Sequence, residues 1–210
     1  MTDDITSSVV IDSGCGYTKC DTAGEDVPRH TFPTVIGKVT GGMDIENMGE
    51  SLDPQQVFVG EEALKKRGLL SLSQPMQRGF IQDWEGMQKI WEHCYTSQLK
   101  LNPTESPVLT TCPPHEKKSI KEQTAQIFFE GLNVPGFYCF VNSLLSLYGS
   151  GRTTGVVLDS GEEITTVLPI QEGSALSHAQ VMVDFGGSDL NLCLHKLLQD
   201  KNPTLYLFNL

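Results

Sequence analysis

The stretch "VVIDSGCGYTK" at residues 9–19 decides the fold, because an altered copy, "VVLDSGEEITT", returns at residues 156–166. Each copy is an apolar, β-branched run that stops at Asp-Ser-Gly, a pattern typical of a buried strand that enters a tight turn. The residues after each turn can pair back as the second arm of a hairpin. The repeat therefore suggests two related α/β units in one chain.

The turn of each hairpin has residues that suit a phosphate ligand. Glycines let the backbone approach a ligand closely, and successive amide N–H groups can converge on an anion. An Asp at the end of the strand can hold a hydrated divalent cation bound to the same anion. Two such hairpins that face each other would clamp a polyphosphate and its metal. Two ordinary hairpins with glycine turns would give the same motif, so the motif alone leaves both readings open.

Composition excludes several classes of protein. The 210 residues are 39% hydrophobic and 20% charged, which is typical of a globular chain of one or two domains. The formal net charge of −11 disfavours a nucleic-acid partner. There is no run of 18 apolar residues, and the start "MTDDITSS" is acidic, so we expect neither a membrane partner nor a signal peptide.

Cysteine and histidine spacing predicts neither disulfides nor a zinc site. The cysteines form no CxxC pair, which favours a reduced, intracellular chain with free thiols, and the histidines lack ligand spacing. A nucleophilic Cys15 or Cys139 would need a histidine partner that the sequence cannot place, so packing thiols are favoured. The residues concerned are Cys15, Cys20, Cys94, Cys112, Cys139 and Cys193, with His30, His93, His115, His178 and His195.

Hydrophobic periodicity predicts alternating strands and helices. Trp84 and Trp91 fall at helical spacing and are expected to be core anchors. Residues 39–56, rich in glycine, acids and amides, are expected to form a mobile surface loop; its acid cluster at 44–53 is a solvated segment or, alternatively, a calcium site. The predicted strands are 8–12, 32–38, 107–113, 155–159, 164–169 and 178–184, and the predicted helices are 83–99, 115–135 and 188–199.

Longer segments resemble actin and its relatives, in order, over nearly all of residues 8–199. They include "VFVGEEALKKRGLLSLSQPMQRGFIQDWEGMQKIWEH", "YGSGRTTGVVLDSG" and "GGSDL". The resemblance implies the actin/Hsp70/sugar-kinase (ribonuclease H-like) α/β fold, with the two DSG copies as its two phosphate hairpins. It further implies a first domain at 1–149 with a small lobe inserted at about 34–74, and the start of a second domain at 150–210.

The resemblance implies a site for ATP or ADP with Mg²⁺. By position, Asp12 and Asp159 would lie near the metal and bind it through water. Asn142 stands where actin has the glutamine that positions the attacking water, so Asn142 and Asp159 are the catalytic candidates. Residues 39–56 replace the loop with which actin subunits grip one another. The expected phosphate-binding residues are Ser13, Gly14, Cys15, Gly16, Lys19, Ser160, Gly161 and Glu162.

Several departures from actin weaken this site. Glu162 and Glu163 replace Asp-Gly, and Glu163 would place a carboxylate against phosphate. Asn142 is one methylene shorter than glutamine, and Thr166 replaces a histidine that helps to order water. Because activation of a water needs accurate placement, hydrolysis is expected to be slow or absent. Cys15 removes a hydrogen-bond donor to phosphate, and Arg78 replaces the histidine that actin methylates.

The chain also stops early relative to actin, and its tail "KNPTLYLFNL" no longer resembles the family. We expect the upper lobe of the second domain to be missing and apolar faces to be exposed unless a partner or the tail covers them. A splice product, a degenerate gene copy and an incomplete gene model all remain open.

Two functions follow from the resemblance. The first is an actin-like cytoskeletal protein with a degraded ATP cleft, associated with filaments or bound in a complex, with little or no ATPase activity. The second is a pseudo-actin scaffold that binds no nucleotide, in a motor-adaptor, chromatin-remodelling or other assembly. Both imply actin, actin-related proteins or a larger complex as partners. Both imply a cytoplasmic, cytoskeletal location, with a nuclear one as an alternative.

Overall fold

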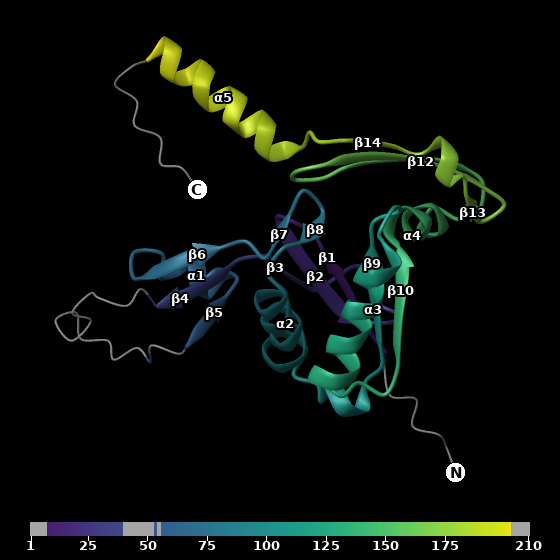
Figure 1. The fold of residues 1–210 in the computed structure, drawn as a ribbon, viewed down its shortest axis with the longest axis horizontal. Helices are drawn as coiled ribbons and strands as arrows, with labels where there is room; N and C mark the ends of the chain where they lie inside the picture. Colours follow the sequence, from purple (N-terminus) through teal and green to yellow (C-terminus); the bar gives the residue numbers. More distant parts are fainter. Residues whose placement is uncertain (1–7, 40–52, 54–55, 203–210) are drawn as a thin grey trace.

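A computed structural model describes residues 8–39, 53 and 56–202, and arranges them as β-sheets with helices packed on them (Figure 1). The largest sheet has five strands in the order β10-β9-β1-β2-β3. Its strands are β1 (Val9–Ser13), β2 (Tyr17–Thr22), β3 (His30–Pro33), β9 (Val108–Cys112) and β10 (Phe137–Val141).

The centre of this sheet combines a hairpin with parallel neighbours. β1 and β2 pair antiparallel, with Ser13 opposite Thr18, while β9 runs parallel to both β1 and β10. Parallel strands need a long crossover, and helices supply it here. The ends of β1, β9 and β10 therefore lie at one edge of the sheet, where Asp12, Thr111 and Asn142 follow or close their strands.

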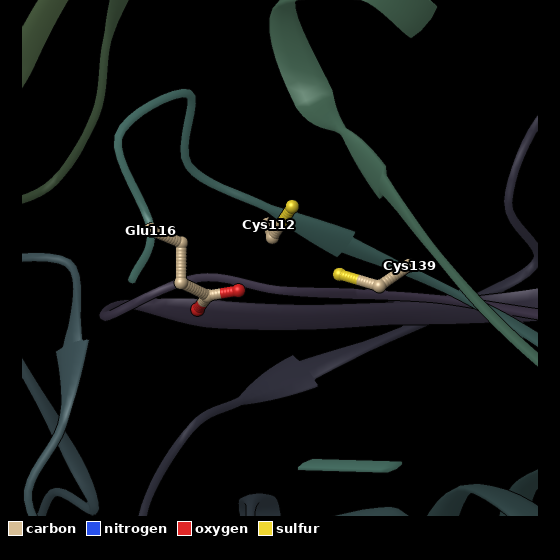
Figure 2. A group of neighbouring side chains, drawn as sticks. All are labelled: Cys112, Glu116 and Cys139. Atoms are coloured by element: carbon tan, nitrogen blue, oxygen red, sulfur yellow. The ribbon is translucent and has the colours of Figure 1, made fainter. Parts of the chain in front are cut away.

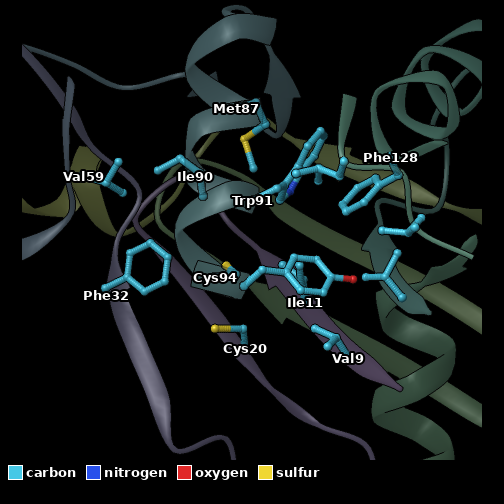
Figure 3. Close-up of a cluster of buried hydrophobic side chains, with 14 of the residues drawn as sticks. Val9, Ile11, Cys20, Phe32, Val59, Met87, Ile90, Trp91, Cys94 and Phe128 are labelled. Atoms are coloured by element: carbon cyan, nitrogen blue, oxygen red, sulfur yellow. The ribbon is translucent and has the colours of Figure 1, made fainter. Parts of the chain in front are cut away.

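The main core lies between this sheet and two helices (Figure 3). α2 (Trp84–His93) starts at Asp83, whose side chain accepts a hydrogen bond from the Gly86 N–H, and continues as a π-helical segment, Cys94–Leu99. α3 (Lys118–Gln126) likewise ends in a π-helical segment, Ile127–Gly131. Trp91 is 3% exposed and Trp84 packs against the same cluster, so the prediction that both are core anchors is confirmed.

A second, three-stranded sheet follows β3 in the chain. The order is β5-β4-β6, formed by β5 (Val57–Val59), β4 (Ile36–Val39) and β6 (Leu70–Ser73), with α1 (Glu61–Lys65) beside it. The prediction of one strand at 32–38 is wrong. The chain leaves the first sheet after Pro33, where the Thr34 N–H bonds to the carbonyl of Gly16 and the Val35 N–H bonds to that of Pro33, and then starts β4.

The third sheet contains the second copy of the repeat. β12 (Thr165–Gln171) pairs antiparallel with β11 (Gly155–Ser160), β13 (Ser174–Ala175) and β14 (Val181–Val183). α4 (Asn142–Gly149) packs on it through Leu147. The last helix, α5 (Gly187–Lys201), has no buried residue (Figure 1).

The remaining elements are short. A two-stranded hairpin, β7 (Met76–Gln77) and β8 (Phe80–Ile81), precedes α2, and 3₁₀ turns cover Pro103–Glu105 and Ser177–Ala179. The latter turn shortens the strand predicted at 178–184 to β14. The division into domains at residues 149/150 stays a prediction. The predicted loop at 39–56, with its acid cluster, and the tail lie almost wholly outside the described residues.

Candidate functional site: a cleft between two hairpins

The two copies of the repeat form matching hairpin turns. The Gly14 N–H donates to the carbonyl of Tyr17 over 3.0 Å, and the Gly161 N–H donates to that of Ile164 over 2.9 Å. Ser160 lies opposite Thr165, as Ser13 lies opposite Thr18. Both turns line one cavity of about 630 Å³. Cavities of this size hold nucleotide-sized ligands, so the volume is compatible with the expected cofactor.

The two aspartates at the strand ends lie on this cavity, each with its own polar partner. The Asp12 carboxylate accepts a 2.7 Å hydrogen bond from the Thr111 hydroxyl and lies 3.5 Å from the Lys19 ammonium. The Asp159 carboxylate accepts a 3.0 Å hydrogen bond from the Asn142 amide. Carboxylates held in this way suit a hydrated Mg²⁺ ion, which binds through a few oxygens and keeps several waters.

The charge balance of the cavity does not suit a polyphosphate. Among the described lining residues, five are carboxylates and one is an ammonium group, Lys19, whose side chain is 49% exposed. A triphosphate bound there would add further negative charge to an acidic, partly enclosed wall. The carboxylates are those of Asp12, Glu116, Asp159, Glu162 and Glu163.

Glu162 occupies the space between the two turns. A Cβ atom placed on Gly16 would lie 3.2 Å from Cγ of Glu162, so the glutamate stem packs directly against the first turn. The same side chain reaches towards Gly187 at the start of α5, where a Cβ would lie 3.5 Å from its Oε2. Phosphate groups held by both turns would need this space. The two aspartates suit a hydrated cation, whereas the Glu162 stem narrows the space between the two turns.

The Glu163 side chain is hydrogen-bonded to another part of the protein. Its Oε2 accepts a hydrogen bond from the backbone N–H of Arg78. It also lies beside Cys15, whose Sγ accepts a 3.1 Å hydrogen bond from the Gly79 N–H. Burial, reinforced by the Glu163 carboxylate and opposed by the Gly79 N–H, raises the pKa of the Cys15 thiol to about 12. Cys15 is thus a packing thiol, as predicted.

Arg78 connects the first part of the chain to the second hairpin and to α5. It is the first residue of the two-residue turn between β7 and β8, where Arg78 and Gly79 have φ of 49° and 79°. Its Nη1 donates to the Glu163 carbonyl over 2.7 Å. Its guanidinium also bonds to both carboxylate oxygens of Asp189, over 2.8 and 3.0 Å. Asp189 in turn accepts from the Gly186 N–H and so caps α5.

The carbonyls of the second turn also hold the start of α5. The Gly187 N–H donates to the Gly161 carbonyl over 3.0 Å, and the Ser188 N–H donates to the Glu162 carbonyl over 2.7 Å. At Gly186 a Cβ atom would lie 2.4 Å from that Glu162 carbonyl oxygen, so only glycine fits. The first glycine of the "GGSDL" segment is therefore required by this close packing, and its aspartate caps the helix.

A sequence model of the actin family matches residues 3–209 of the 210. The chain belongs to the actin family. The mixed α/β architecture with its multi-stranded sheets is the actin/Hsp70 fold, as predicted, and a partial second domain is consistent with it. Members of the family generally bind ATP or ADP with Mg²⁺ and associate with actin or with protein complexes. No helix among the described residues is both long and apolar enough to cross a membrane.

The structure brings the predicted actin-family site residues together around the one cavity. It also adds contacts that the sequence reasoning did not predict. Thr111 holds Asp12, the indole N–H of Trp91 donates to the Ser13 hydroxyl over 3.3 Å, and Asp189 holds Arg78. These pairs are 78 to 111 residues apart in the chain. The sequence indicated only that the segments "QRGF" and "GGSDL", which contain Arg78 and Asp189, match the actin pattern. It did not indicate that the two side chains meet.

Proposed function

We propose that this chain is an actin-family subunit whose ATP cleft is degraded and which works bound to a filament or within a larger protein complex. The observation that carries the proposal is the packing of the Glu162 side chain against Gly16, in the space between the two hairpin turns. Together with the five carboxylates of the cavity, it opposes tight binding of ATP or ADP.

Little or no ATPase activity follows from the same geometry. The Asn142 amide is engaged with Asp159, and its Oδ1 accepts a 2.8 Å hydrogen bond from the Ser143 N–H in the first turn of α4. A short amide that already has two partners is poorly placed to orient an attacking water. Thr166, in place of a histidine, is 3% exposed and supplies no titratable group. Asn142 and Asp159 are therefore retained as weak catalytic candidates only.

Arg78 supports a second candidate function, that of a pseudo-actin scaffold that binds no nucleotide. In this proposal the bidentate Arg78–Asp189 contact, rather than a nucleotide, holds residues 1–149 and 150–210 together. The scaffold would serve in a motor-adaptor, chromatin-remodelling or similar assembly.

Exposed apolar side chains support a protein partner in either case. Among the described residues, β11, β14 and α5 expose apolar side chains that globular proteins normally cover. We propose that actin or an actin-related protein, or another subunit of a complex, covers this surface, in the cytoplasm with the cytoskeleton or in the nucleus. The exposed side chains are Val156, Leu158, Val181, Met182, Val183, Phe185, Leu190, Leu192, Leu194 and Leu197.

Retention of nucleotide separates the two candidates. The purified chain is incubated with Mg-ATP and desalted, and bound nucleotide is then measured by chromatography. Weak or partial retention supports the degraded cleft, and complete absence supports the scaffold. Stoichiometric ATP that survives desalting, together with turnover at a rate typical of actin, contradicts both.

A further inference from the structure

Three potential metal ligands other than the predicted magnesium-binding aspartates meet in the wall of the cavity. The Sγ atoms of Cys112 and Cys139 and a carboxylate oxygen of Glu116 all lie within 4.8 Å of one another (Figure 2). They form the one such group of His, Cys, Asp and Glu side chains found in the part of the chain that the structure describes. The expectation of no zinc site rested on linear spacing, which does not detect ligands on separate strands.

The backbone fixes the two thiols on one face of the sheet. Cys112 ends β9 opposite Val141, and Cys139 lies in β10 opposite Thr110, with the two strands parallel. Residues two apart on a strand share a face, so Cys112, Thr110 and Cys139 point to the same side. Glu116 comes from the loop after β9, and Figure 2 shows its carboxylate turned towards the sulfur of Cys139. Little chain movement is thus needed to bring three ligands onto one ion.

The position is partly buried, which favours a specific site over a surface cluster. Cys112 is 3% exposed, and Glu116 and Cys139 are intermediate. Thr110, 4% exposed, lies beside Cys139 on the same face of the sheet.

The ligand types select the metal. Thiolates favour Zn²⁺ and other thiophilic ions over Mg²⁺ and Ca²⁺, which prefer oxygen ligands. Zn–S bonds of about 2.3 Å and Zn–O bonds of about 2.0–2.2 Å place two tetrahedral ligand atoms roughly 3.5–3.8 Å apart. The three ligand atoms here lie within 4.8 Å of one another, so small side-chain movements bring them onto one ion. Two thiolates and a carboxylate leave one tetrahedral position, which would face the cavity that all three residues line.

We propose that Cys112, Glu116 and Cys139 bind a thiophilic divalent cation such as Zn²⁺, with three protein ligands and a fourth position open to the cleft. The site lies at the ends of β9 and β10, so an ion there ties the loop after β9 to the sheet.

Cadmium titration of the reduced, chelator-treated chain tests the proposal. Cd²⁺ reports thiolate ligation through its ultraviolet charge-transfer absorption, and elemental analysis after desalting gives the number of ions retained. We expect one Cd²⁺ per chain, displaced by Zn²⁺ but not by excess Mg²⁺. Cys112→Ala together with Cys139→Ala should abolish retention, and Glu116→Gln should weaken it on the order of tenfold or more.

The Cys20 and Cys94 thiols provide a matched control. They are also buried and hydrogen-bonded to each other, but no third ligand joins them among the described residues. Cys20→Ala with Cys94→Ala should leave the stoichiometry and affinity unchanged. Loss of cadmium in this control, no retention by the wild type, or an unchanged affinity in Glu116→Gln would each overturn the proposal. If the Cys112 and Cys139 variant fails to fold, the Glu116→Gln result decides alone.

Discussion

The guanidinium of Arg78 forms two hydrogen bonds to the carboxylate of Asp189, 111 residues later in the chain. Bidentate pairs of this kind combine strength with a defined orientation. Here the pair joins the tip of the β7–β8 hairpin to the first turn of α5 and, through the Glu163 carbonyl, to the second hairpin. It therefore joins the two sides of the cleft directly.

Removal of this contact should loosen the cleft. We expect Arg78→Ala to increase the radius of gyration in small-angle X-ray scattering and to speed proteolysis near residues 150–165. Lys89→Ala, which removes a surface ion pair with Glu92 on α2, is the control. If the two variants behave alike, the Arg78 contact does not hold the cleft.

The same contact sets a pH dependence. The Arg78 hydrogen bond, helped by the Gly186 N–H, lowers the pKa of Asp189 from its ordinary 3.8 to about 2. The ionised carboxylate therefore stabilises the fold above pH 3.8, and this contribution is lost as the pH falls through about 2. Asp189→Asn should flatten this part of the acid unfolding curve measured by circular dichroism. An acid limb of the same shape in both proteins would contradict the assignment.

Gly79 should tolerate no side chain. A Cβ at this position would lie 2.6 Å from Cδ1 of Ile164, and its φ of 79° is strained for other residues. Gly79→Ala is expected to reduce the free energy of unfolding by about 1–3 kcal/mol in urea titration. Gly24→Ala, at φ of 100° with nothing within 4 Å, has the backbone strain without the clash and should cost less. Equal costs would show that the contact with Ile164 is unimportant.

The cysteines should differ widely in reactivity. Because burial and Glu163 raise the pKa of Cys15 to about 12, its thiolate is scarce at neutral pH. Cys193 is exposed on α5. Iodoacetamide labelling followed by mass spectrometry should modify Cys193 first and Cys15 late, with the difference lost in urea. Rapid labelling of Cys15 in the folded chain would contradict its placement.

Glu162 and Glu163 differ in their expected effect on nucleotide. Glu162 fills the space between the turns, whereas Glu163 is bonded to Arg78, so Glu162→Gly should tighten Mg-ATP binding more than Glu163→Gly. Glu172→Gly changes a glutamate at φ of 50° in the β12–β13 turn, outside the cavity lining, and should leave binding unchanged. Fluorescent ATP titration compares the three. A larger gain in Mg-ATP affinity for Glu163→Gly would contradict the assignment of the obstruction to Glu162.

The isolated chain should not form filaments. Growth in the actin manner requires a head-to-tail contact that repeats without closing, and the exposed apolar surface of β11, β14 and α5 favours a stable contact with one partner instead. Sedimentation in Mg²⁺, salt and ATP, followed by electron microscopy, tests this expectation. Ordered filaments would contradict it, whereas amorphous aggregate would agree with the exposed apolar surface of β11, β14 and α5.

Local sequence patterns correctly predicted the strands and helices that bury one apolar face. The hairpin at Val9–Thr22 and the helix that starts after Asp83 followed from apolar periodicity and an N-cap residue. The strand at 32–38 failed because β-propensity does not reveal that the chain changes sheets after Pro33. The predicted phosphate-loop residues do meet at one cavity, since the repeat encodes both turns.

Long-range side-chain contacts were beyond the sequence. The actin pattern placed Glu163 against phosphate, but its carboxylate turns towards Arg78 because the β7–β8 turn presents a backbone N–H to it. The grouping of Cys112 with Cys139 depends on the register of two parallel strands, which no linear spacing specifies.

The affinity of the wild-type chain for Mg-ATP tests the central claim most directly. Titration of a fluorescent ATP analogue in the presence of Mg²⁺ should give a dissociation constant weaker than about 1 µM, or no saturable binding, because Glu162 and the other carboxylates oppose the phosphates. Stoichiometric binding with a nanomolar dissociation constant would contradict the account of a degraded cleft.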